Sequence, residues 1–151
     1  MFKSIKSLLG SQRPVNDKPS TRLAVTILLL EASFVDGECS PAELAKIKAA
    51  IRRQFSLTDN DAEQLISQAR QKRRETVDLW QFSNQINNDF SEAQKIQIME
   101  TAWQIFYADG ILNSDEDQYA HTMAKLLRLS HEQLIAAKLK GRAACNNSIS
   151  R

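Results

Sequence analysis

The sequence predicts an all-α protein of about seven helices, built around two pseudo-repeated helical hairpins. The 151 residues include only four Gly and three Pro, while residues with good helix propensity are frequent. This composition favours helix over a turn-rich sheet. From Ser20 onward, apolar residues also recur at the three- and four-residue spacing of a buried helix face. The length suits a single domain with one core.

The chain is expected to divide into three segments. Residues 1–19 read as a flexible or amphipathic N-terminal segment, because a short apolar strip is followed by a polar stretch with two prolines. Residues 20–142 hold the helical periodicity and form the predicted domain. Residues 143–151 are expected to form a disordered tail.

Residues typical of helix starts mark where the first three predicted helices begin. Ser20 can cap a helix that runs to about Val35. The second helix opens at residues 40–43, Ser-Pro-Ala-Glu, which form a capping box with proline in the first helical position. A third helix begins at Thr58 or Asp59 and carries the next apolar face.

The basic run from Arg70 to Arg74 is interpreted as a connector or as the frayed end of the third helix. A fourth helix is expected over residues 77–87. Capping signals then open a fifth helix at residues 91–94, a sixth at residues 113–116 and a seventh at residues 130–133.

Two segments of the chain match each other at an offset of 73 residues. In residues 35–43 and 108–116, the Asp, the Gly and the Glu recur in register, and Ser40 aligns with Asn113 at the helix start. Both copies therefore lie in the same helix-turn-helix context. An internal duplication of this kind usually packs as a pseudo-twofold pair, because neither hairpin can bury its apolar faces alone.

This duplicated Asp-Gly-x5-Glu pattern, with its capped Ser-Pro-Ala-Glu helix, resembles the TerB family of tellurite-resistance proteins over about residues 20–140. The resemblance implies a non-enzymatic stress-response module with an all-helical fold. It also implies that acidic residues around the two turns bind a divalent metal such as calcium or magnesium. Carried over residue by residue, the metal ligands are Asp36, Glu43, Asp109 and Glu116.

The residues themselves leave two readings of these turns open. Asp-Gly-x5-Glu is the second half of a calcium-binding loop, but the first half is missing, so neither turn supplies the six to eight oxygens of an independent site. Two paired turns can hold one hard cation together with water. Alternatively, Glu43 and Glu116 serve only as helix caps, and the Gly residues only end the preceding helices.

Charge and composition narrow the classes of partner. The formal net charge of +2 gives no reason to expect nucleic acid. Residues 76–120 hold eight acids and one base, whereas residues 121–151 hold six bases and one acid, so the molecule is expected to be dipolar. The two cysteines show no metal or redox spacing, and no apolar run is long enough to span a membrane, which favours the cytoplasm.

The favoured function is therefore an interaction or stress-response module whose acidic surface near Asp36 and Asp109 binds a divalent cation or a partner protein. No arrangement of residues suggests a nucleophile or a phosphate loop, so an enzyme is not expected. The alternative is a co-chaperone-like or membrane-associated adaptor, in which residues 1–19 provide a peripheral membrane contact. The basic run from Arg70 to Arg74 is either a solvated helix end or a contact for an acidic or phosphate-bearing partner.

Overall fold

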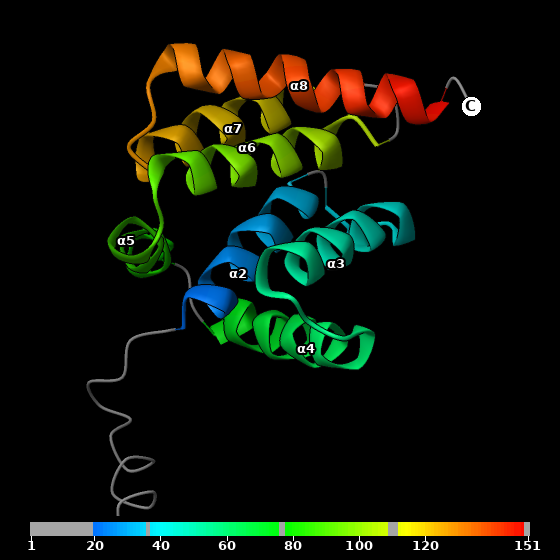
Figure 1. Cartoon of the computed structure of the whole chain (residues 1–151), viewed down its shortest axis with the longest axis vertical. Coiled ribbons are helices and arrows are strands. Elements are labelled where there is room, and N and C mark those ends of the chain that lie inside the picture. Colours follow the sequence, from blue (N-terminus) through cyan, green and yellow to red (C-terminus); the bar gives the residue numbers. More distant parts are fainter. Residues whose placement is uncertain (1–19, 36, 76–77, 109–111, 150–151) are drawn as a thin grey trace, which may run out of the picture.

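The structure, a computed structural model, describes residues 20–35, 37–75, 78–108 and 112–149. These residues form seven α-helices and no strand, which confirms the all-α prediction (Figure 1). The helices are α2 (Thr21–Ser33), α3 (Pro41–Phe55), α4 (Asp59–Glu75), α5 (Trp80–Asp89), α6 (Glu92–Phe106), α7 (Ser114–Leu126) and α8 (His131–Ile149).

Helix α2 lies at the centre of the fold. It is buried almost all round, from Ala24 to Ala32, as expected for a helix enclosed by others. It contacts α3, α4, α5 and α6, while α8 packs along α6 and over α7. Figure 1 shows the layer of α6, α7 and α8 above the group of α2, α3 and α4, with α5 at one side.

The internal duplication covers three helices in each copy rather than a hairpin alone. Ser56 (φ 54°) follows α3 and Arg128 (φ 58°) comes shortly after α7, so both copies turn through a left-handed residue that is not glycine. In each copy the third helix, α4 or α8, begins three residues later. Helix α4 packs on α2 just as α8 packs on α6. The repeat units are therefore α2–α4 and α6–α8.

A half-buried tyrosine joins the two units. The hydroxyl of Tyr119 on α7 donates a hydrogen bond to the carbonyl of Leu28 on α2, at 3.1 Å. Burial raises the pKa of Tyr119, so the hydroxyl keeps its proton and remains a donor. This bond fixes α7 against the central helix.

Most of the large aromatic side chains lie in the core or pack against it. Phe82, Trp103 and Phe106 are fully buried. Trp80 differs, since 60% of its surface is exposed. Helix α5 buries the face that contains Phe82 and Ile86, and a residue two positions before Phe82 points to the opposite face of a helix.

The structure decides one segment boundary that the sequence left open and differs from the expectation at another. Residues 70–75 are the last part of α4, the second of the two expected alternatives, and not a connector. Helix α8 continues to Ile149, where a tail was expected from residue 143. The reason is a long-range contact: Cys145 is buried, with its Sγ 3.5 Å from the carbonyl oxygen of Gln104 on α6. The predictions for residues 1–19 concern a segment outside the described residues.

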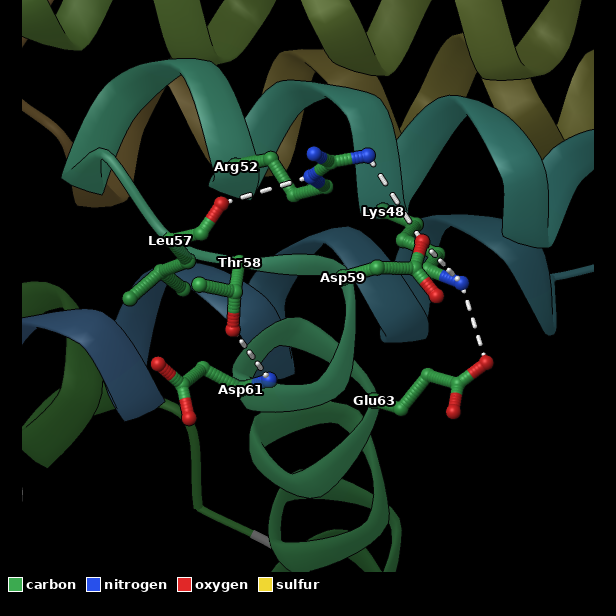
Figure 2. Close-up of polar contacts among 7 residues, drawn as sticks. All are labelled: Lys48, Arg52, Leu57, Thr58, Asp59, Asp61 and Glu63. Carbon is green, nitrogen blue, oxygen red and sulfur yellow. Dashed lines mark hydrogen bonds and ion pairs between the residues drawn. The ribbon is translucent and has the colours of Figure 1, made fainter.

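The hairpin of α3 and α4 is closed by a group of charged side chains (Figure 2). Lys48 Nζ lies 2.7 Å from Asp59 Oδ1 and 3.0 Å from Glu63 Oε1. Arg52 approaches Asp59 from the other side, at 3.6 Å. The hydrogen bond from Lys48 lowers the pKa of Asp59, and the same bond raises the pKa of Lys48.

These shifts predict how Asp59 contributes to acid stability. A carboxyl group whose pKa is lowered by folding stabilises the folded state above its unfolded pKa of about 4, and this contribution is lost as the pH falls through the folded value. Asp59→Asn should therefore show a smaller fall in the free energy of unfolding between neutral pH and acid pH than the unmodified chain. Urea unfolding at both pH values measures this difference. The same pH dependence in both proteins would contradict the assignment.

Candidate functional site

Glu43 and Glu116 occupy equivalent places at the start of α3 and α7. Glu43 Oε1 accepts a hydrogen bond from the backbone N–H of Ser40 at 2.8 Å, and Ser40 Oγ accepts one from the N–H of Glu43 at 3.1 Å. Glu116 and Asn113 make the same reciprocal pair, at 3.1 and 2.9 Å. The predicted capping boxes are therefore present in both copies.

Both glutamates are also buried, which capping alone does not require. Glu43 is 7% exposed and Glu116 is 2% exposed. A carboxylate in the first turn of a helix is favoured by the partial positive charge of the helix N-terminus. Removing a carboxylate from water nevertheless costs free energy, so each site must provide compensating interactions.

Two further capping boxes in the described part of the chain use a neutral amide. Ser91 pairs with Gln94 at the start of α6, with bonds of 2.8 and 3.2 Å. Ser130 pairs with Gln133 at the start of α8, with bonds of 2.8 and 3.1 Å. Glutamine therefore makes the same two hydrogen bonds in this fold. Among the four capping boxes of the described residues, glutamate stands at the two that follow an Asp-Gly turn.

The first Asp-Gly turn shows why its glycine is needed. Gly37 has φ +109°, in the region that L side chains rarely adopt, and its N–H donates to the carbonyl of Phe34 at 3.0 Å. The predicted ligands Asp36 and Asp109 lie outside the described residues, as does Gly110.

The helices before the two turns lie together. Helices α2 and α6 contact each other and both run toward the right in Figure 1. Their C-terminal ends therefore lie toward the same side of the molecule. Among the described residues, no group of three or more His, Cys, Asp or Glu side chains is placed to hold a metal ion. The predicted set of four carboxylates is complete only with Asp36 and Asp109.

One contact between titratable groups was not expected from the sequence. The rings of His121 on α7 and His131 on α8 lie with their centroids 6.0 Å apart. His121 Nδ1 is 2.8 Å from the carbonyl oxygen of Asp117 and 3.7 Å from its carboxylate. The internal repeat could have predicted this contact. At the offsets of 73 and 72 residues, His121 and His131 correspond to Lys48 and Asp59, which form an ion pair in the first unit.

The fold and its caps define the class: an all-helical domain of two related three-helix units, each with an acid-capped turn. The family model described as "Tellurite resistance protein TerB" matches residues 22–139. The chain belongs to the TerB family, as its sequence resemblance implied. Comparisons with curated proteins and with solved structures gave no match. None of the described helices has the length and apolar character required to cross a membrane.

Proposed function

We propose that this chain is a non-enzymatic, cytoplasmic stress-response module of the tellurite-resistance type, whose two acidic turns bind one divalent cation. The observation that carries the proposal is the choice of residue at the four capping boxes. Glutamine caps α6 and α8, while a buried glutamate caps α3 and α7 after each Asp-Gly turn. The extra negative charge is not needed for capping, so we assign it to binding a cation.

The donor set fits a hard cation. Carboxylate oxygens are the ligands that calcium and magnesium prefer, and water completes the coordination shell when the protein supplies few ligands. Asp36, Glu43, Asp109 and Glu116 would hold the ion. Since the side chains come from both repeat units, a bound cation would offset their negative charge and link the two units.

Amide chemical shifts recorded during titration with calcium, magnesium, manganese and zinc test the proposal. We expect at least one of these ions to shift the amides of the two turns, Gly37 and Gly110 among them, at sub-millimolar concentration. The double variant Asp36→Asn/Asp109→Asn should lose this response and keep its helix content. If no ion perturbs the turns, the proposed metal site is wrong.

The glutamines at the other two boxes suggest a matched control for capping. In Glu43→Gln/Glu116→Gln, the amide oxygen can still accept the bond from the N-cap N–H, as it does at Gln94. We therefore expect this variant to fold but to bind the ion more weakly. A variant that folds and binds the ion as tightly as the unmodified chain would show that the glutamates act as caps only.

A further inference from the structure

A groove between α3 and α4 begins at the first turn of α3, where Pro41 lines it beside the first acidic cap. Its volume is about 430 Å³, and its apolar wall is formed by Pro41, Leu44, Ala45 and Ile66. Ser67 and Arg70 line it from α4, together with Lys48 and Glu63. The groove therefore combines an apolar surface with a small number of charged groups, as binding sites for peptides and small ligands commonly do.

The charged residues of the groove differ in their partners. Lys48 and Glu63 pair with each other at 3.0 Å, so their charges are largely matched. Arg70 makes no hydrogen bond or ion pair with any described residue, although its Nε is shielded from solvent. A shielded donor without an acceptor costs free energy, and an incoming acceptor would recover it.

The second repeat unit carries charged side chains at the positions that correspond to Leu44 and Ile66 of the groove wall. Leu44 and Ile66 correspond to Asp117 and Lys138, by the offsets of 73 and 72 residues that relate the caps. In the second unit these two side chains form an ion pair at 3.7 Å. The first unit instead presents two apolar side chains beside an unpaired arginine.

Two other arginines of the basic run, Arg73 and Arg74, differ in their contacts. Arg73 Nε lies 2.7 Å from Glu31 Oε1, and its guanidinium lies 4.0 Å from the ring centroid of Phe34. Arg73 is therefore committed to holding α4 against α2. Arg74 is exposed and does not line the groove, so it adds positive potential near the groove without belonging to it.

We propose that the α3–α4 groove binds a short peptide segment of a partner protein, with an apolar side chain against Leu44 and Ile66 and an Asp or Glu carboxylate on Arg70. Charge complementarity selects this occupant, because the groove offers one unmatched positive group beside an apolar wall. A guanidinium and a carboxylate form a strong, directional pair. This binding does not depend on the cation proposed for the acidic turns.

Selection of peptides with the full-length chain from a random library displayed on phage tests the proposal. We expect the selected peptides to contain an apolar residue close to an Asp or Glu. The binding of fluorescently labelled selected peptides can then be measured by anisotropy. Arg70→Gln should weaken binding roughly tenfold or more, as expected for loss of a charge-assisted hydrogen bond.

Two variants control for overall charge and for the groove itself. Arg74→Gln removes the same charge from the same helix, and binding should stay within about twofold, as for an exposed charge outside the contact. Ser67→Tyr adds a ring to the groove wall at an exposed position and should block binding without removing a core contact. The double variant Asp36→Asn/Asp109→Asn should bind the peptides normally, which separates this proposal from the metal site.

Three outcomes would overturn the proposal. The first is a selection that yields no binding peptide. The second is a set of peptides that bind Arg70→Gln and Ser67→Tyr as tightly as the unmodified chain. The third is binding of vesicles that contain phosphatidylglycerol, dependent on Arg70, with no peptide binding, which would assign the groove and its arginine to a lipid surface.

Discussion

Trp103→Ala is expected to lower the free energy of unfolding by about 3–5 kcal/mol, the range for removing a large aromatic side chain from a core. Trp103 is completely buried at the interface of α6 and α8. Its ring meets Phe106 edge-on, with centroids 5.6 Å apart, and Lys138 Nζ lies 5.1 Å from its centroid. The variant loses these contacts and leaves a cavity between the two helices.

Urea unfolding followed by circular dichroism measures this effect without using tryptophan fluorescence. Trp80→Ala provides the control, since Trp80 is largely exposed and its loss should change the free energy of unfolding by no more than about 0.5 kcal/mol. Equal effects of the two substitutions would contradict the assignment of Trp103 to the core.

Gly141→Val is expected to destabilise the fold by about 2–3 kcal/mol, in the upper part of the range for overpacking. A Cβ at Gly141 would lie 2.7 Å from the Cβ of Trp103 and 3.0 Å from the carbonyl oxygen of Glu100. The carbonyl oxygen of Glu100 belongs to the backbone of α6 and cannot rotate away. Helix α8 would have to move off α6.

The same substitution at an exposed position separates this clash from the lower helix propensity of valine. Ala143→Val lies two residues further along α8 and is exposed, so it should cost only a few tenths of a kcal/mol to about 0.7 kcal/mol. Thermal unfolding of both variants measures the two effects. A Gly141→Val protein as stable as Ala143→Val would show that α6 and α8 do not need this close approach.

Features set by neighbouring residues could be predicted from the sequence. The starts of α3, α6 and α7 follow from capping boxes at Ser40, Ser91 and Asn113, because the donor and acceptor lie three residues apart in the chain. The Asp-Gly-x5-Glu duplication is local in the same sense. Its extension to α4 and α8 was harder to see, because the two units differ in the contacts that close them.

Features set by distant contacts were not predictable. The end of α8 depends on Gly141 and Cys145 packing against α6, some forty residues earlier. The exposure of Trp80 depends on which face of α5 meets the core. Helical spacing identifies an apolar face but not its neighbour.

At the candidate site, the sequence predicts the capping boxes but not the burial of the two capping glutamates. Glu43 and Glu116 follow the capping pattern that Gln94 and Gln133 also follow, and only the packing shows that the first two carboxylates are shielded from water. The α3–α4 groove likewise requires the placement of Arg70 beside Leu44. These properties arise from tertiary packing.

The proposed metal site requires the two acidic turns to hold one divalent cation together. Isothermal titration calorimetry of the full chain with calcium, magnesium, manganese and zinc tests this directly, because the method counts the ions bound. We expect one ion per chain for at least one of these metals, and no binding to Asp36→Asn/Asp109→Asn. Two independent ions per chain, or no binding of any of the four metals, would contradict the proposed site.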